Sequence, residues 1–188
     1  MPDPHWTIAA PSTRQPPLGR NQNVELKARV VDLDRARQMA EQVATEYLGR
    51  EHQIDTYFGC REGRLKLREI DGTTAHLIWY RRPDQTDEKV SAYSVFAVHQ
   101  PEELRRALDA ATGITKVVDK TREIFLYENV RIHLDEVQGL GSFLEFEAVL
   151  GPEHDKQSGE AKVKHLRQKF EIAVADLLAN SYCDLLDA

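Results

Sequence analysis

The sequence predicts an α+β fold in which about eight β-strands form one antiparallel sheet covered by three helices. Short segments with alternating polar and apolar residues recur along most of the chain, and hairpin-type turn sequences join many of them. The helix-like segments are few, and their apolar residues lie on one stripe. An antiparallel sheet with helices outside can close into a barrel.

Alternation predicts the first strand over residues 23–31. Seven further strands are predicted at residues 53–58, 64–70, 75–82, 91–98, 116–127, 130–137 and 142–150. A helix is expected near residues 34–48, and another between Pro101 and Gly113. The last helix is expected at about residues 156–179.

The 188 residues suit one domain, which we place at residues 23–188, after a proline-rich and disordered tail at residues 1–22. The net charge of −6 argues against nucleic-acid binding. No run approaches the roughly 18 apolar residues of a membrane span. Cys60 and Cys183 form no disulfide or zinc pattern, which favours a cytoplasmic location. The sequence leaves a homodimer open.

Charged side chains gather on one face of five strands, because residues two apart on a strand share a face. Those faces carry Asn23, Glu25, Lys27 and Arg29; Arg64, Lys66 and Arg68; Lys120 and Arg122; Arg131, His133 and Asp135; and Glu145 and Glu147. The opposite faces are apolar. The simple interpretation is that the charged faces are solvated. The amphipathic helices favour another one, in which they cover the apolar faces and the charged faces turn into the lumen of a closed barrel.

A charged lumen needs a counter-charge, because isolated buried ions are costly. Lys and Arg side chains converging from several strands suit a triphosphate, and carboxylates on the same faces suit Mg²⁺ or Mn²⁺. No serine or cysteine stands out as a nucleophile. Direct attack on phosphorus by a metal-activated water molecule is therefore the simplest reaction.

The order and spacing of these segments resemble the CYTH family, or triphosphate tunnel metalloenzymes, whose members include class IV adenylyl cyclases, thiamine triphosphatases and inorganic triphosphatases. The matching segments are Asn23-Val24-Glu25-Leu26-Lys27, Asp55-Thr56-Tyr57-Phe58, Gly63-Arg64-Leu65-Lys66-Leu67-Arg68, Tyr80-Arg81-Arg82-Pro83-Asp84, Lys120-Thr121-Arg122, Arg131-Ile132-His133-Leu134-Asp135 and Gly141-Ser142-Phe143-Leu144-Glu145-Phe146-Glu147. The resemblance covers the chain from Asn23 to about Leu186 and is strongest with the "CyaB-like" branch.

The resemblance implies a closed eight-stranded antiparallel barrel, the triphosphate tunnel, with flanking helices. It implies that the catalytic residues are Glu25, Lys27, Lys66 and Arg68. The triphosphate would contact Lys27, Lys66, Arg68, Arg82, Lys120, Arg122 and Arg131. Mg²⁺ or Mn²⁺ would be held by Glu25, Asp135, Glu145 and Glu147. At the strand end before Pro83, Arg81 competes with Arg82 for the place in the tunnel.

One residue departs from the family signature Glu-x-Glu-x-Lys: Asn23 stands where the first glutamate belongs. Asparagine offers a neutral oxygen, which holds a metal ion less strongly than a carboxylate. Three functions remain open on the sequence. The first is a metal-dependent hydrolase of inorganic tripolyphosphate or a small organic triphosphate. The others are a class IV adenylyl cyclase that makes cyclic AMP from ATP, and a weakly catalytic polyphosphate- or nucleotide-binding module.

Overall fold

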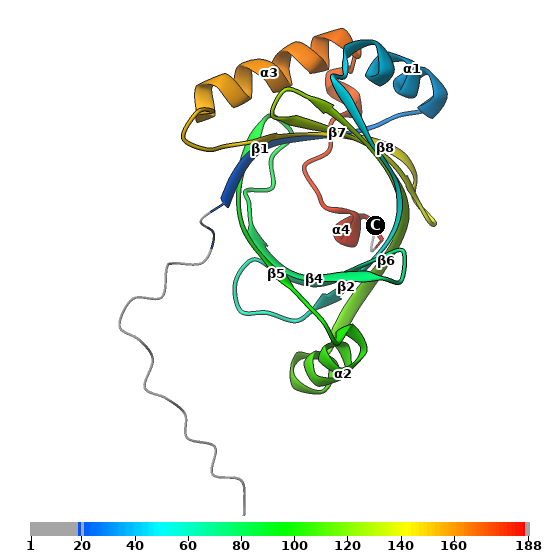
Figure 1. Cartoon of the computed structure of the whole chain (residues 1–188), viewed down its shortest axis with the longest axis vertical. Coiled ribbons are helices and arrows are strands. Elements are labelled where there is room, and N and C mark those ends of the chain that lie inside the picture. The colour runs from blue at the N-terminus through cyan, green and yellow to red at the C-terminus, as the bar shows by residue number, and fades with distance from the viewer. Residues whose placement is uncertain (1–18, 20, 187–188) are drawn as a thin grey trace, which may run out of the picture.

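The structure is a computed structural model and describes residue 19 and residues 21–186. Its strands are β1 (Asn21–Arg29), β2 (Glu46–Phe58), β3 (Arg64–Ile70), β4 (Thr74–Arg81), β5 (Lys89–Ala97), β6 (Ile114–Tyr127), β7 (Val130–Val137) and β8 (Gly141–Val149). They close into one antiparallel barrel in the order β1-β5-β4-β3-β2-β6-β7-β8 (Figure 1). The predicted eight-stranded barrel is confirmed.

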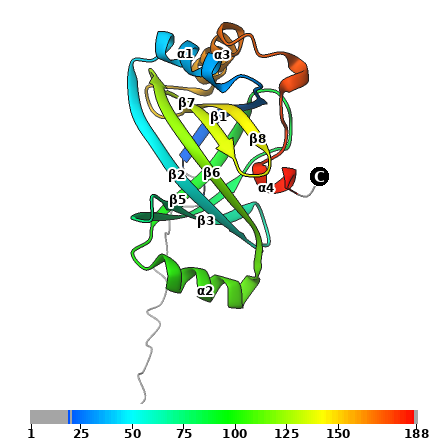
Figure 2. The same cartoon turned by 90° about the vertical axis from the view of Figure 1, so that its right-hand side faces the viewer.

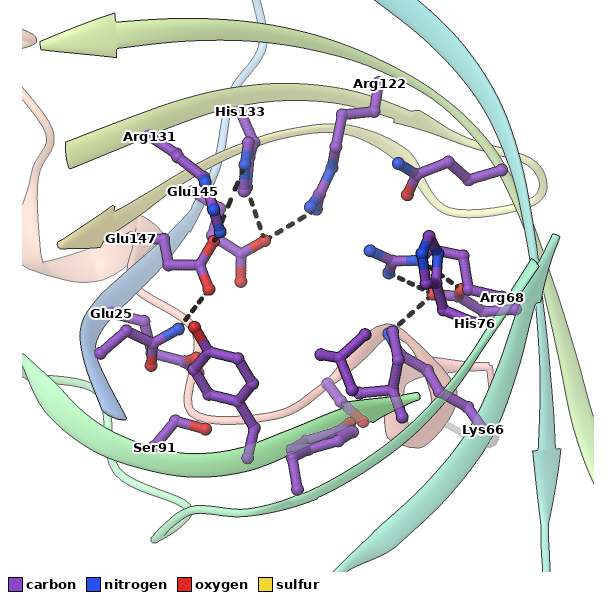
Figure 3. A pocket seen from close by; sticks show the side chains of 18 of the residues that line it. Glu25, Lys66, Arg68, His76, Ser91, Arg122, Arg131, His133, Glu145 and Glu147 are labelled. Atoms are coloured by element: carbon purple, nitrogen blue, oxygen red, sulfur yellow. Dashed lines mark hydrogen bonds and ion pairs between the residues drawn. The ribbon is translucent and has the colours of Figure 1, made fainter. Parts of the chain in front are cut away.

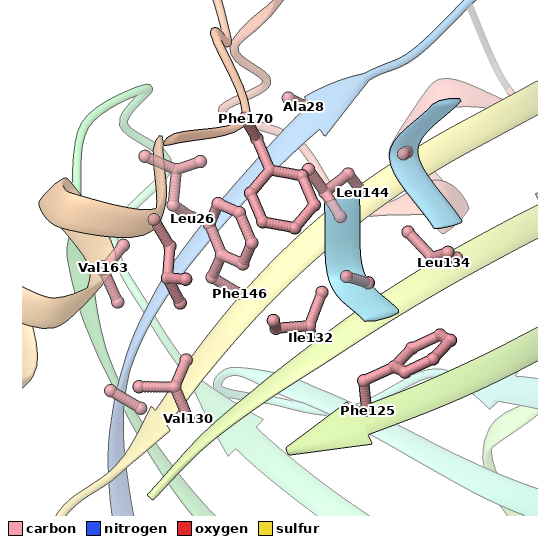
Figure 4. Close-up of a cluster of buried hydrophobic side chains, with 14 of the residues drawn as sticks. Leu26, Ala28, Phe125, Val130, Ile132, Leu134, Leu144, Phe146, Val163 and Phe170 are labelled. Carbon is pink, nitrogen blue, oxygen red and sulfur yellow. The ribbon is translucent and has the colours of Figure 1, made fainter. Parts of the chain in front are cut away.

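Two helices cover one side of the barrel, α1 (Leu33–Val43) and α3 (Lys156–Lys169) (Figure 1). Both begin at an aspartate whose side chain accepts a hydrogen bond from a backbone N–H of the first turn. Under them lies the main apolar core, formed by the outward faces of β1, β7 and β8 (Figure 4). The rings of Phe146 on β8 and Phe170 after α3 meet edge to face, with centroids 5.2 Å apart.

Helix α2 (Pro101–Thr112) lies on the opposite side of the barrel (Figure 1). Leu104 and Leu108 of this helix pack on a smaller buried cluster that contains Phe58 and Leu67. The predicted bounds for this helix are confirmed, with Pro101 at its start and Gly113 after its end. The helices therefore cover apolar outer faces of the barrel, as the strand pattern predicts.

The chain after α3 returns to one end of the barrel through a 3-10 helix, η1 (Val174–Asp176), and ends in the short helix α4 (Tyr182–Leu185) (Figure 2). The backbone N–H of Leu178 donates to the carbonyl of Lys27 at 2.9 Å. The buried ammonium of Lys89 donates to the carbonyl of Ala179, also at 2.9 Å. These bonds fix the segment that leads to α4.

The first predicted helix, residues 34–48, was too long. Helix α1 ends at Val43, and the chain enters β2 at Glu46. The backbone N–H of Thr45 already donates to the carbonyl of Leu126 on β6, at 2.7 Å. From this point the backbone bonds to the sheet instead of continuing the helix. A register shift between Tyr47 and Gly49, where Gly49 has φ of 117°, interrupts the alternation that would have revealed the strand.

The last predicted helix, residues 156–179, was also too long, because α3 ends at Lys169. Glu171 has φ of 53°, a left-handed conformation that stops a helix. Val174, which lies within the predicted helix, is 72% exposed. Residues beyond the turn form η1 and α4.

The first strand begins at Asn21, so residues 21 and 22 belong to β1 rather than to the predicted disordered tail. Gly19 is also placed, and its backbone N–H donates to the Ser94 hydroxyl. The rest of the predicted tail, residues 1–18 and 20, lies outside the described residues. Among the described helices, none combines the length and apolar character that crossing a membrane requires.

Candidate active site

The charged strand faces point into the barrel and enclose a cavity of about 610 Å³. This volume suits a small-molecule ligand. Seven Lys or Arg side chains and five Asp or Glu side chains line it, whereas the whole chain has a net charge of −6. The lumen therefore concentrates cations against the overall balance, as an anion site requires.

One wall of the cavity is basic and carries Lys66 and Arg68 (Figure 3). A buried aspartate, Asp55 of β2, organises this wall. Its carboxylate accepts from Lys66 at 2.8 Å and from Arg68 through two bonds of 2.7 Å. Burial opposes ionisation of Asp55, yet Arg68 and Lys66 hold its pKa well below the ordinary value. Burial, with Arg68 beside it, lowers the pKa of Lys66 to about 8. The wall thus holds ammonium and guanidinium groups close together at an energetic cost.

A second aspartate, Asp135 of β7, plays the same part for the neighbouring cations. Both of its oxygens accept from Arg122 at 2.6 Å, and the Tyr182 hydroxyl donates to one of them, also at 2.6 Å. The ammonium of Lys120 lies between the two aspartates, 3.9 Å from Asp55 and 3.8 Å from Asp135. Burial, and then Arg122, lower the pKa of Lys120 well below its ordinary value.

The facing wall is acidic, with Glu25 on β1 and Glu145 and Glu147 on β8 (Figure 3). Strand register places Glu25 opposite Glu147, which brings the carboxylates together. Each one has a cationic partner: Arg82 pairs with Glu25, Lys27 lies 3.2 Å from Glu145, and Arg131 lies 3.2 Å from Glu147.

Burial raises the pKa of Glu25, and Arg82 only partly compensates. For Glu145 burial acts in the same direction, but Lys27 and the neighbouring His133 hold its pKa well below the ordinary value. His133 lies between the glutamates, with Nδ1 3.5 Å from Glu145 and Nε2 3.9 Å from Glu147. Burial, and then Arg122, lower the pKa of His133, which favours its neutral form at neutral pH.

Asn23, which departs from the family signature, lies within the acidic wall. Its side-chain nitrogen donates to Glu147. Its side-chain oxygen is buried and, within the part of the chain that the structure describes, accepts no hydrogen bond. The amide of Asn23 therefore holds one carboxylate of the acidic wall and leaves one neutral, buried oxygen as an unused acceptor.

The acidic wall fits a divalent cation by its chemistry, although it does not form a complete cage. Among the described residues, no three His, Cys, Asp or Glu side chains are gathered so as to hold a metal ion by themselves. Mg²⁺ is usually bound through one or two carboxylates, while substrate phosphates and water supply the remaining oxygens. Glu25, Glu145 and Glu147 offer such oxygens on one wall of the cavity.

All seven predicted substrate-binding side chains line the cavity: Lys27, Lys66, Arg68, Arg82, Lys120, Arg122 and Arg131. Arg82 is the inward one of the two arginines before Pro83, because Arg81 is exposed. Three of the four predicted metal ligands, Glu25, Glu145 and Glu147, line it too. The fourth, Asp135, is fully buried behind the wall and is held by Arg122 and Tyr182.

Sequence reasoning overlooked several inward residues. Asp55 and Tyr57 have no role in the predicted site, yet both line the cavity. The signal was present, because Gln53, Asp55 and Tyr57 alternate along β2 as the charged residues do on other strands. Tyr182 carried no such signal, since the last helix was expected to end just before it. Its ring lies under the Lys27 ammonium, 3.6 Å from the nitrogen.

We compared the sequence of this closed barrel with models of known protein families. The family model described as "CYTH domain" matches residues 21–182. The chain belongs to the CYTH domain family. The match covers all eight strands of this CYTH barrel and ends at Tyr182, the first residue of α4.

Relatives of this CYTH domain match nearly their whole length. A protein of Methanocaldococcus jannaschii named "Putative adenylate cyclase MJ0240" is 23% identical over 171 residues, which cover 86% of this chain and 97% of that protein. The solved structure of the PH1012 protein of Pyrococcus horikoshii has a TM-score of 0.78 at 22% identity, and the match covers 87% of this chain and 98% of that one.

A solved structure from Hippeastrum also has the fold, with a TM-score of 0.61 at 13% identity. The match covers 89% of this chain and 95% of that one. That protein is described as "Putative adenylyl cyclase HpAC1", which "reveals a dominant triphophatase activity". These likenesses support the barrel fold of this chain.

Proposed function

We propose that this chain is a metal-dependent phosphohydrolase that binds a triphosphate in the barrel lumen, where water attacks phosphorus. The single observation that carries the proposal is the pair of facing walls, one basic around Asp55 and one acidic around Glu145, inside one cavity. A phosphate chain between these walls would meet cations on one side and carboxylates that suit a divalent cation on the other.

The basic side chains would bind and orient the phosphates. Asp55 and Asp135 hold Lys66, Arg68 and Arg122 in fixed directions before any ligand arrives. Such an arrangement stabilises charge that develops on phosphate oxygens without a cost of reorganisation in the reaction. We assign Asp135 to this positioning role, because its oxygens are already taken by Arg122 and Tyr182.

The acidic wall would hold Mg²⁺ or Mn²⁺ through Glu25, Glu145 and Glu147. When bound, the cation would neutralise phosphate charge and make water a better nucleophile. The wall's carboxylates also supply acceptors for the proton that an attacking water loses. The Hippeastrum protein, with its described triphosphatase activity, supports hydrolysis as the reaction.

Release of phosphate from a panel of triphosphates, with Mg²⁺, with Mn²⁺ and with a chelator, tests the proposal. We expect turnover that needs the cation, and a loss of about 100-fold in kcat for Glu145→Gln. Glu136→Gln is the matched control, because Glu136 is on the neighbouring strand but its side chain is 55% exposed. Absence of phosphate release from every compound, or equal activity in the two variants, would refute hydrolysis at this site.

The second candidate is adenylyl cyclisation, in which the ribose hydroxyl of ATP attacks the α-phosphate. The name of the Methanocaldococcus jannaschii relative favours it. If ATP gives cyclic AMP and pyrophosphate instead of phosphate, the reaction at this site is cyclisation and not hydrolysis.

The third candidate, a weakly catalytic binding module, follows from Asn23. Asn23→Glu would then raise phosphate release strongly, because a carboxylate would strengthen the acidic wall's hold on the cation. A wild-type protein that is already active, with no gain in this variant, would exclude the module.

A further inference from the structure

The two ends of the cavity differ in chemistry. At the end next to α4, Tyr182 lies beside Lys27 and Lys120. Along β6, the inward positions then run from Lys120 through Arg122 to Ile124, away from Tyr182. Ile124 is four residues beyond Lys120, or about 13 Å along the strand. On β6, the charged inward positions are therefore followed by an apolar one, Ile124.

Strand β3 repeats this change from charged to apolar, and β4, β5 and β2 add apolar side chains to the cavity lining. On β3, the inward residues Lys66 and Arg68 are followed by Ile70. On β4 and β5, Ile78 and Val95 are register partners, and both line the cavity. Leu48 of β2 lies next to Gly49, the register partner of Ile124. The apolar side chains at this end, which we call the apolar end, are Leu48, Ile70, Ile78, Val95 and Ile124, and Glu51 and His76 line the cavity beside them.

This apolar end is accessible, since Leu48 is 49% and Val95 is 44% exposed. Inorganic tripolyphosphate has no apolar surface, so it would leave these side chains in water. An organic group attached to the phosphate chain would cover them, and burial of apolar surface would add to its affinity.

The side-chain oxygen of Gln53, next to the apolar end, restricts the chemistry of the ligand further. Gln53 is 2% exposed and is the register partner of Ile70. Its nitrogen donates to Glu51 at 2.6 Å, whereas its oxygen is buried and has no hydrogen-bond partner in the described residues. Ionised phosphate oxygens only accept hydrogen bonds, so they cannot satisfy this oxygen. A ligand group with an N–H or O–H can.

We propose that the ligand is an organic triphosphate, whose organic group has an apolar ring face and an N–H or O–H donor and binds between Ile70, Ile78 and Val95, beside Gln53. The inference rests on the proposed function for the phosphate part of the site. It separates organic triphosphates from inorganic tripolyphosphate, which the charged walls alone do not distinguish.

The test compares inorganic tripolyphosphate with ATP, GTP, CTP, UTP and thiamine triphosphate, measuring both the dissociation constant and kcat/KM. We expect at least one organic compound to exceed tripolyphosphate by about 10-fold or more, the scale set by small apolar groups in a pocket. A preference for tripolyphosphate over every organic compound would overturn this inference and leave the proposed function intact. Failure of all compounds to bind would refute both.

Two variants locate the effect. Val95→Thr keeps the shape of the side chain and adds a hydroxyl, and Gln53→Leu removes the acceptor. Each should raise the KM of the preferred organic compound relative to that of tripolyphosphate by about 10-fold. Phe96→Ala is the control, since Phe96 follows Val95 on the same strand and lies outside the cavity lining. The tripolyphosphate value shows that each variant is folded, and an unchanged ratio in both variants would overturn the inference.

Discussion

The inside and the outside of this barrel are both buried, but they follow opposite rules. On β1, Leu26 points outward into the apolar core under the helices and is 1% exposed. The next residue, Lys27, points into the lumen and is 4% exposed. Apolar burial favours folding, whereas buried charges cost free energy that their partners only partly return. We infer that the outer core supplies stability and that the lumen supplies binding.

The largest effect should come from the outer core. Phe146→Ala removes a fully buried ring that contacts Phe170, so we expect the free energy of unfolding to fall by about 3–5 kcal/mol. Urea denaturation measures it. Val31→Ala is the control, because Val31 is fully exposed and should change stability by less than about 0.5 kcal/mol. Similar losses of unfolding free energy in Phe146→Ala and Val31→Ala would contradict the contrast between the outer core and the surface.

A lumen substitution should act on function instead. Lys66→Met keeps the length of the side chain but removes a charge that would contact phosphate, so kcat/KM should fall by about 100-fold. Stability should change by about 1 kcal/mol or less, because burial already disfavours this ammonium and Asp55 keeps Arg68 as a partner. Lys164→Met, on the exposed face of α3, is the control. If Lys66→Met lost as much stability as Phe146→Ala, the inference that the outer core supplies stability and the lumen supplies binding would be contradicted.

The smallest expected effect is on pH dependence. Burial, then Arg68 and Arg122 of β6, lower the pKa of Lys66 to about 8, against the attraction of Asp55 from β2. A bound anion favours the charged amine. Affinity for the triphosphate should therefore be retained below about pH 8 and fall about tenfold per unit above it, until the pKa of the bound form is reached. Titration calorimetry from about pH 7 to about pH 9.5 measures this fall.

Lys66→Arg is the matched variant for the pH prediction. A guanidinium stays charged throughout this range, so the fall in affinity above about pH 8 should disappear. If the variant shows the same fall as the wild type, another group causes it.

The strands could be predicted from the sequence because inward and outward residues differ so clearly. On β3, for example, Lys66 and Arg68 alternate with Leu65 and Leu67. The beginning of β2 was missed because the register shift at Gly49 breaks the alternation. The end of α3 was missed because the spacing of apolar residues continues past Glu171, where the backbone turns.

The candidate site could be predicted in its composition but not in its pairing. Charge type and strand face select Lys66 and Arg68, whereas the choice of Asp55 as their shared partner depends on the register between β2 and β3. Asp135 shows the same limit. Its strand face is shared with His133, but its depth and its contact with Tyr182 depend on where the last residues of the fold pack.

The closure of the barrel has a consequence for how the protein is made. Strand β1 leaves the ribosome first among the strands, yet it pairs with β5 and with β8, the last strand. Lys27 and Glu145, register partners from these two ends of the barrel sequence, meet only through that final pairing. Pairing between such distant segments is slow, because a long loop must close first. A nascent chain that ends before β8 therefore has an unfinished seam and lacks Glu145 and Glu147, two of the three carboxylates of its acidic wall.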